Sequence, residues 1–457
     1  MSSNVRLNYE EMRAIILSLS IAVVSLTTCW PDRAAAGEAI VVVPLTSNHQ
    51  QVLTPGTLGV IINLSDPDSV ALGAYYARLR HIPVSNIIGL HLPIANSIDG
   101  QVLSDALLQL HRATNYGHLL AFALAFSKPY RVDENQSITS AFAQGIARST
   151  WIGSCNLTRE NPDKALGPGA ELSVKPAFLL DGGGGIASSM ALVRRGKAGD
   201  ASDPAAAILL AGTDEGSRSL PREPSMKNAA NTFPDVARFE KLSPETFSNA
   251  GPLIGFETGL ASIPKIHLLE FLPGAFADSL TSYGGAINDN VGQTTASQMI
   301  RAGATASFGT VREPCNFKGK FPDPTRVIAN YLAGDSILEA YWKSVDMTTE
   351  GLFIGEPLTR PFPILDAKLK DGLLVLRANK RTLRYLDRSF GGNIGANERS
   401  IATDATIAFG LYSVETGSPH LVQEIVIPNS IKPGQIIATV PFATNNSEST
   451  VLGILRH

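Results

Sequence analysis

The sequence predicts an α/β protein with a mostly parallel sheet flanked by helices, followed by a smaller all-β domain. The first observation is a strand, helix, strand succession over Leu58–Leu64, Val70–Arg80 and Asn86–Leu92. Such a unit within about 35 residues is typical of parallel strands joined by a crossover helix. The second is that this alternation continues as far as Val311. The third is a change, after Phe362, to short alternating runs separated by turn residues.

Each expected element is bounded by residues that favour it. Leu58–Leu64 is a short apolar run typical of a buried strand. Ser65, Asp66 and Pro67 offer a helix start, and Pro83 ends the helix that follows. The same reasoning gives helices over Val102–Arg112, Ser188–Arg195 and Asp335–Val345, and strands over His118–Phe126, Lys175–Leu180, Ala205–Ala211, Pro252–Phe256, Ile266–Leu272 and Ala304–Val311.

The last part of the chain has a different pattern. Turn-forming glycine and proline clusters separate four alternating runs, which predict a small β-sandwich. These runs are Leu373–Arg377, Thr406–Val414, Leu421–Ile427 and Ile436–Val440. The expected organisation is therefore a leader over residues 1–36, an α/β domain over 37–362 and a β-sandwich-like domain over 363–457.

Composition excludes several classes of protein. The 457 residues include 38 Lys and Arg against 41 Asp and Glu, a net charge of −3, and no basic stripe is visible. A nucleic-acid partner is therefore not expected. The three cysteines lack C-x-x-C spacing, and the eight histidines form neither H-x-x-x-H nor H-E-x-x-H. The sequence thus gives no reason to expect a metal or another cofactor.

The first residues have the pattern of a secretory signal peptide. Arg13 precedes the apolar run Ala14–Leu26, and Ala34-Ala35-Ala36 matches an A-x-A cleavage site. We expect cleavage near Ala36 and an exported protein, periplasmic or extracellular, with no membrane association afterwards. Two alternatives remain: an uncleaved anchor, since residues 14–31 are uncharged, and lipidation at Cys29.

The sequence does not assemble a catalytic site from its cysteines and histidines. Cys155 and Cys315 both lie among turn formers, where a disulfide between them, two free thiols or a catalytic thiolate are all open. A catalytic cysteine needs a histidine beside it, and His118 and His267 adjoin or lie within expected strands. A lone histidine there is more often a structural, hydrogen-bonded residue.

Three stretches together resemble a known family. They are Ser69–Pro83, Phe271–Gly285, and a series from Ala302 to Pro314 that continues through Tyr331–Gly334, Glu339–Trp342 and Ile354–Leu358. This combination resembles an exported bacterial family that accompanies exosortase protein-sorting systems. The resemblance covers roughly residues 55–362, and it implies a cellular context without implying a reaction.

A second resemblance is to gingipain-type cysteine peptidases, which have a caspase-like α/β fold followed by an immunoglobulin-like domain. It rests on the succession of Ala304–Val311, Gly334–Ala340 and Gly355-Glu356-Pro357. It implies a caspase/gingipain-like sheet. In those peptidases a histidine ends one strand and a cysteine ends the next, whereas the matching ends here read Gly255–Gly259 and Phe271–Gly274. The resemblance therefore implies a peptidase-like fold without its dyad.

Together these observations predict a non-catalytic protein of the cell envelope that binds a peptide or glycan in a cleft at the strand ends. The alternative is an active cysteine-type hydrolase that uses Cys155 or Cys315. For two of the cleft residues, Asp278 and Ser282, helix-surface and capping positions are an equal alternative. The residues expected in the cleft are Glu257, Thr258, Pro273, Asp278 and Ser282.

Overall fold

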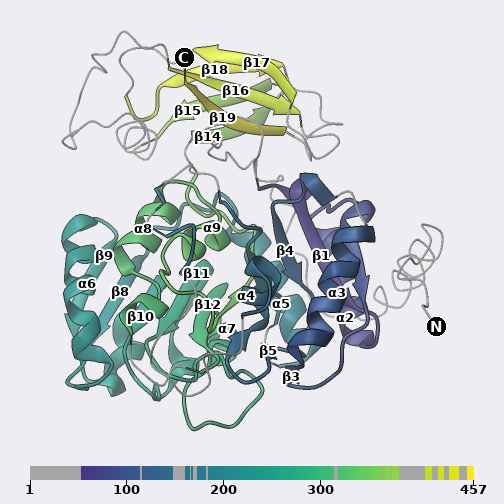
Figure 1. Ribbon diagram of the computed structural model, residues 1–457. Coiled ribbons are helices and arrows are strands. Elements are labelled where there is room, and N and C mark those ends of the chain that lie inside the picture. Colours follow the sequence, from purple (N-terminus) through teal and green to yellow (C-terminus); the bar gives the residue numbers. More distant parts are fainter. Residues whose placement is uncertain are drawn as a thin grey trace.

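A computed structural model gives the arrangement of the chain (Figure 1). It describes residues 53–113, 116–147, 160–164, 166–167, 172–181, 184–312, 317–363, 365–371, 373–379, 407–413, 420–426, 432–441 and 450–456. A ten-stranded sheet dominates it, with the strand order β2-β1-β4-β7-β13-β12-β11-β10-β8-β9. The expected signal peptide, Cys29, Cys155 and Cys315 lie outside the described residues.

The first group of strands is parallel and occupies one side of the sheet. It contains β1 (Leu58–Asn63), β2 (Ile87–Leu90), β4 (Ala121–Leu124) and β7 (Ala177–Leu179). The connecting helices are α2 (Pro67–Leu79), α3 (Gly100–Ala113) and α4 (Ile138–Gln144). Helix α2 starts where the sequence predicts, because the Asp66 carboxylate accepts the amide of Asp68 at its N-cap.

The second group of strands is also parallel and occupies the other side. It contains β8 (Ala207–Gly212), β9 (Ala237–Lys241), β10 (Leu253–Thr258), β11 (Phe271–Ser279) and β12 (Ala306–Thr310). Helix α5 (Ile186–Gly199) leads into this group, and α6 (Ser219–Thr232) joins β8 to β9. The short 3₁₀ segments η4 (Pro244–Ala250) and η5 (Ile266–Leu268) precede β10 and β11, and α7 (Ala296–Ala302) precedes β12.

Strand β13 (Gly351–Gly355) lies between the two groups. It runs antiparallel to β12 and meets β7 at Ile354 and Leu179. Beyond β4 and β11, the side chain of Asn288 donates to the Ser127 carbonyl at 2.8 Å. Helices α2 and α5, which pack side by side, also end together, since Arg80 beyond α2 pairs with Asp200 beyond α5. The carboxyl ends of both groups therefore lie at one edge of the sheet, called the carboxyl edge below.

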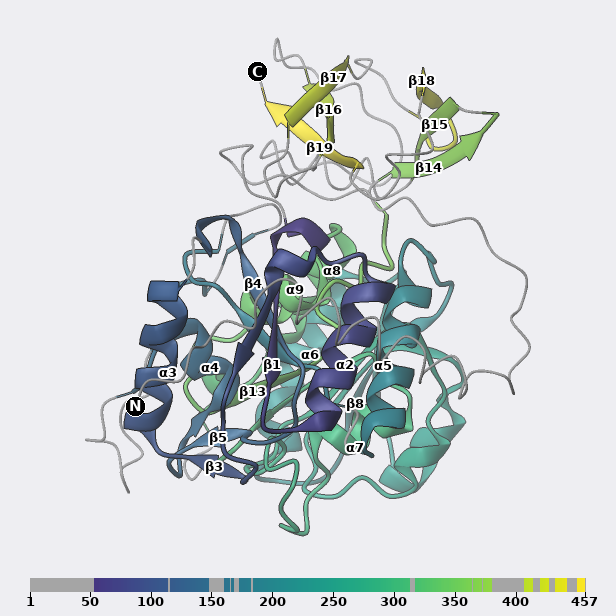
Figure 2. The same cartoon turned by 90° about the vertical axis from the view of Figure 1, so that its right-hand side faces the viewer.

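Helices cover both faces of the sheet, which explains why the sequences of many of its strands are continuous apolar runs. One face packs on α2, α5, α6, α8 (Pro324–Leu332) and α9 (Ile337–Trp342), and the other on α3, α4 and α7. Figure 2 shows α2 and α5 side by side on the first of these faces. Trp342 stacks on Phe353 of β13 with ring centroids 4.4 Å apart, which fixes α9 against the centre of the sheet.

The elements expected from the sequence omit some that the structure contains, and one expected strand is misplaced. Helix α6 was not expected, because it contains Pro221 and Pro224, and proline disfavours a helix interior. The expected strand Ile266–Leu272 is wrong, because this stretch holds η5 and only the beginning of β11. The true strand continues to Ser279. Pro273 and Gly274 lie inside this strand, and such turn formers usually mark the end of one. The expected strand was therefore ended too early.

The C-terminal part contains short antiparallel strands, in the manner expected for an all-β region. One three-stranded sheet has the order β14-β15-β18 and another the order β17-β16-β19. In Figures 1 and 2 these strands lie apart from the large sheet. Their bounds are β14 (Leu365–Lys370), β15 (Leu373–Ala378), β16 (Ile407–Ser413), β17 (His420–Val426), β18 (Ile436–Pro441) and β19 (Thr450–Arg456).

Candidate functional site

The structure brings three of the predicted cleft residues together at the carboxyl edge. Glu257 and Thr258 end β10, and Asp278 lies opposite Glu257 on β11. All three side chains are fully buried rather than exposed in an open cleft. Asp278 is a strand residue, so its alternative assignment to a helix surface is wrong.

A buried arginine explains how two carboxyl groups can lie side by side there. The Arg222 side chain, from α6, forms ion pairs with Glu257 at 3.0 Å and with Asp278 at 2.5 Å. It also donates to the Thr258 carbonyl at 2.7 Å, and Tyr341 of α9 donates to Asp278 at 3.3 Å. We call Arg222, Glu257, Asp278 and Tyr341 the carboxyl-edge cluster. It ties α6 and α9 to two strand ends.

One positive charge faces two carboxyl groups in this cluster, and their pKa values reflect it. Burial raises the pKa of Glu257 well above its ordinary value, and the neighbouring Asp278 raises it further. Burial also raises the pKa of Asp278, although Arg222 opposes that shift. Oxygen Oε1 of Glu257 accepts no hydrogen bond from the described part of the chain. Burial thus favours the protonated form more strongly in Glu257, whose pKa is raised well above its ordinary value, while Asp278 makes the shorter ion pair with Arg222.

The carboxyl end of β11 is closed rather than open to substrate. Beyond Asp278, the next three residues, 279 to 281, are buried as well. Ser282 follows in a turn, half-buried, and its carbonyl accepts the hydroxyl of Thr310 at 3.1 Å. The turn packs on Gly309, where an added Cβ would lie 2.2 Å from the backbone of Gly284. No larger residue than glycine fits at position 309, so the turn seals this strand end.

Pro273 lies far from the other predicted site residues. It is the third residue of β11 and therefore lies near the amino end of that strand. Gly274, the next residue, has a φ of 90° and donates its amide to Thr305 at 2.9 Å. Pro273 was placed in the cleft because the strand was expected to end there, and that placement is wrong.

An open hollow of about 560 Å³ lies at the outer end of the carboxyl edge, beyond β8, β9 and β10. The sequence did not predict it, because it is formed by three loops that are far apart along the chain. Its rim carries charged and hydroxyl groups, and its apolar part comes from two leucines and a proline. The lining residues are Thr213, Asp214, Glu215, Lys241, Leu242, Ser243, Pro244 and Leu260.

Local hydrogen bonds hold the walls of the hollow. The amide of Thr213 donates to Ser219 at 2.7 Å, which fixes the chain as it leaves β8. Glu215 accepts the amides of Arg218 and Ser219 at the start of α6, and its pKa is lowered, because these bonds and one from Ser217 outweigh its slight burial. Leu260 is held by Ser279, which accepts its amide at 3.0 Å.

The described histidines do not lie beside these strand ends. His118 precedes β4, within hydrogen-bonding distance of Asn86 at 3.1 Å, and His267 is exposed in η5 before β11. Both therefore lie at the amino ends of strands, away from the carboxyl edge. His91, beyond β2, is an exposed imidazole 3.3 Å from the Ser65 hydroxyl. That pair is fully solvated, which favours an ordinary surface contact.

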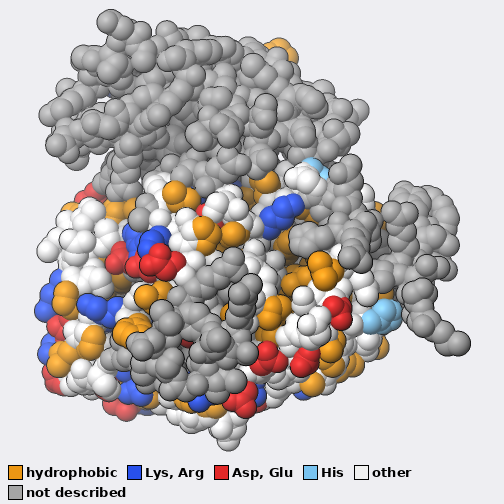
Figure 3. Space-filling model, in the orientation of Figure 1, with side chains coloured by type: hydrophobic (Ala, Val, Ile, Leu, Met, Phe, Trp, Pro, Cys, Tyr) orange, Lys and Arg blue, Asp and Glu red, His pale blue; other side chains and the backbone are white. Residues whose placement is uncertain are grey.

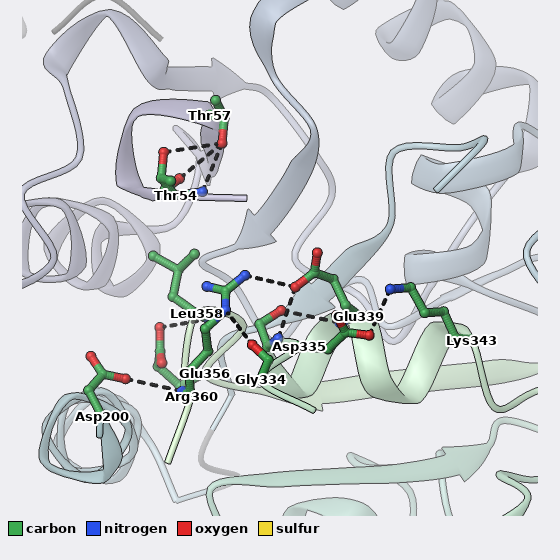
Figure 4. Close-up of polar contacts among 11 residues, drawn as sticks. Thr54, Thr57, Asp200, Gly334, Asp335, Glu339, Lys343, Glu356, Leu358 and Arg360 are labelled. Atoms are coloured by element: carbon green, nitrogen blue, oxygen red, sulfur yellow. Dashed lines mark hydrogen bonds and ion pairs between the residues drawn. The ribbon is translucent and has the colours of Figure 1, made fainter. Parts of the chain in front are cut away.

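A second buried ion network lies at the opposite edge. Arg80, at the end of α2, pairs with both Glu356, just beyond β13, and Asp200, just beyond α5. Tyr76 donates to Glu356 at 2.6 Å. Figure 4 shows how Arg360 continues the network, donating its amide to Asp200 and its guanidinium to Glu339 and the Gly334 carbonyl. We call Tyr76, Arg80, Asp200 and Glu356 the amino-edge cluster.

Other features limit the chemistry available. Within the described ranges, no group of three or more His, Cys, Asp or Glu side chains is arranged to hold a metal ion. No helix in the same ranges is long and apolar enough to cross a membrane. On the face shown in Figure 3, acidic and basic side chains are interspersed rather than gathered by sign. Among the described residues of this face, no basic patch of the kind that nucleic acids select is visible.

Comparison with known proteins does not assign this site. No family model, no curated protein and no solved structure matches the chain.

Proposed function

We propose that this chain is an exported protein of the cell envelope with a caspase/gingipain-like body that lacks the His/Cys dyad, and that it binds an extended peptide at the carboxyl edge. The observation that carries this proposal is the carboxyl-edge cluster. The ends of β10 and β11, where a peptidase of this type needs an imidazole and a thiol, hold Glu257 and Asp278 instead. Both are buried and committed to Arg222.

The order of elements near the end of the domain supports the peptidase-like body. Strand β12, helix α9 and strand β13 follow one another as the resemblance implies, and β12 pairs with β13. The short antiparallel strands beyond Phe362 are consistent with an appended β domain. Export is supported by the charged, apolar and A-x-A pattern of residues 13–36.

The chemistry of the hollow favours a peptide over a glycan. Its lining residues include no aromatic side chain on which a sugar ring could stack. Its charged groups are already paired, Asp214 with Lys241 at 2.8 Å and Glu215 with Arg218 at 3.1 Å. What remains for a ligand is an apolar strip of Leu242, Pro244 and Leu260 among hydroxyl groups, beside a strand end, which suits a side chain of a peptide.

The test uses purified protein recovered from the cell envelope. We expect its N-terminal sequence to start near Gly37, and we expect a thiol-reactive activity probe to label it no faster in the folded than in the heat-denatured state. Incubation with a mixture of synthetic peptides should leave them uncut, as judged by mass spectrometry. Labelling of Cys155 or Cys315 that requires the folded protein, together with peptide cleavage, would identify an active cysteine-type hydrolase and overturn the proposal.

A further inference from the structure

Strand β9 ends the sheet on the side of the hollow. Both of its faces are covered: Lys227 of α6 lies 4.9 Å from the Phe239 ring centroid on one, and on the other Arg238 donates to the Ala250 carbonyl at 2.9 Å. None of the strands that the structure describes pairs with its outer edge. An edge strand exposes backbone donors and acceptors that can pair with an incoming chain.

Two hydrogen bonds determine which residues of β9 face outward. The Ile208 amide donates to Val236, and the Leu242 amide donates to Gly212, so residues 236 and 242 face β8. Because alternate residues of a parallel strand bond to the same side, positions 238 and 240 also face β8. The N–H and C=O groups of Phe239 and Lys241 therefore point outward. Neither residue has a backbone hydrogen bond to a turn or loop of the described chain.

The other edge of the sheet is different. Strand β2 lies there, and three of its four residues are buried, whereas β9 has one buried residue among its five. Residue Lys241, at the end of β9, also lines the hollow, with its side chain 48% exposed. An open edge and a pocket thus meet at one residue, Lys241.

We infer that an extended peptide adds to the outer edge of β9 as an additional strand and places one apolar side chain in the hollow, against Leu242, Pro244 and Leu260. This inference rests on the proposed function and specifies its mode of binding. Backbone pairing supplies the affinity, and the pocket selects the side chain. The charged rim adds little selection, because Asp214 and Lys241 already neutralise each other.

The experiment separates backbone pairing from side-chain contact at Lys241. A short random peptide library is selected on the wild-type protein, and the selected peptides are synthesised and their affinity measured by titration. Lys241→Pro removes the outward N–H without removing a bond to β8, which an edge strand tolerates. Lys241→Ala keeps that N–H and removes the charge. Because both variants lose the charged side chain, the N–H is the difference between them, and we expect Lys241→Pro to bind about tenfold more weakly than Lys241→Ala.

A second measurement does not depend on how the variant folds. Peptides methylated at alternate backbone nitrogens should lose affinity for the wild-type protein in one alternation only. Equal losses for Lys241→Pro and Lys241→Ala, or equal affinity for both methylated series, would overturn strand addition while leaving peptide binding intact. Failure to select any peptide on the wild-type protein would instead overturn the proposed function itself.

Discussion

The two parallel groups of the sheet share a design but differ at their carboxyl ends. Counted from its own outer edge, each group reads second, first, third, fourth strand: β2-β1-β4-β7 on one side and β9-β8-β10-β11 on the other. Each first strand ends with the same anchor. The Asn63 amide donates to Ser69 at 2.7 Å, and the Thr213 amide donates to Ser219 at 2.7 Å.

Beyond these anchors the groups diverge. In the first group the Asn63 side chain bridges to Leu92, accepting its amide at 3.0 Å and donating to its carbonyl at 3.2 Å. The segments that follow β2 and β4 form a small sheet of β3 (Ser97–Ile98), β5 (Arg131–Val132) and β6 (Gln136–Ser137). In the second group Thr213 is too short to make such a bridge, and the hollow lies in that region.

The difference teaches where this fold has room for a ligand. The carboxyl ends of one group are tied together by side-chain and strand hydrogen bonds, whereas those of the other leave an open volume next to an unpaired edge. Ligands of open α/β sheets generally bind outside the carboxyl ends of strands. The predictions below test whether the shared anchors and ion clusters are equivalent, and whether the divergence matters.

The largest expected effect is the loss of either central arginine. Arg222→Ala and Arg80→Ala should each lower the free energy of unfolding by roughly 3–5 kcal/mol, because two buried carboxyl groups lose their counter-charge. Urea denaturation measures this. The control is Arg218→Ala, whose pair with Glu215 is partly exposed and should cost about 1 kcal/mol or less. A small cost for only one arginine would mean that the two clusters are not equivalent.

The next effect distinguishes the two strand-end anchors. Asn63→Ala leaves the buried amide and carbonyl of Leu92 without partners and should cost about 1–3 kcal/mol. Thr213→Ala removes one 3.2 Å contact to the Glu215 amide and should cost less than about 1 kcal/mol. Chemical denaturation of both variants under one condition provides the comparison. If the costs are equal, the bridge in the first group is not what closes it.

The smallest effect concerns how the protonation of Glu257, in the carboxyl-edge cluster, changes stability with pH. The raised pKa of Glu257 means that its contribution to stability is present at low pH and declines as the pH rises above its ordinary value of 4.5. Glu257→Gln mimics the protonated form, so it should stay within about 1 kcal/mol of wild type and lose less stability between pH 4 and pH 8. The matched variant Asp278→Asn breaks the ion pair and should cost about 3 kcal/mol.

The change of stability with pH can be measured from denaturation midpoints at a series of pH values. A Glu257→Gln variant whose stability falls with pH as steeply as that of the wild type would show that Glu257 is ionised in the folded protein. Asp335, whose pKa is raised to about 6 by burial, contributes a decline of the same sign between about pH 4 and pH 6 and is unchanged in both variants. The difference between the wild type and Glu257→Gln therefore reports on Glu257 together with the neighbouring Asp278.

Much of the fold could be predicted from local pattern. The expected strand Leu58–Leu64 and helix Val70–Arg80 correspond to β1 and α2, whose helix begins three residues earlier, since an apolar run, a cap and a stop signal lie next to one another in the chain. Strand β9 was missed, because its sequence Ala237–Lys241 alternates charged and apolar residues over only five positions. Strand β11 was misplaced for the reason given above.

The candidate site was predicted only in part. Glu257 and Thr258, which the peptidase resemblance placed at a strand end, are the last two residues of β10. Their burial could not be foreseen, since it depends on Arg222, which is 35 residues away in a helix that the pattern did not reveal. The hollow likewise had no local signal, because its walls come from three separate loops.

By itself the sequence determined the periodicity of the α/β domain, the change to short strands after Phe362, and the absence of histidine and cysteine from Glu257–Gly259 and Asp278–Leu280. Only the tertiary structure decided that Glu257 and Asp278 share one arginine, and that the strand ends of the first group are bridged while those of the second leave a hollow. The physical reason is the separation along the chain over which each kind of interaction acts. Caps and apolar runs act between neighbours in the chain, whereas charge pairing and enclosed volume depend on which distant segments the fold brings together.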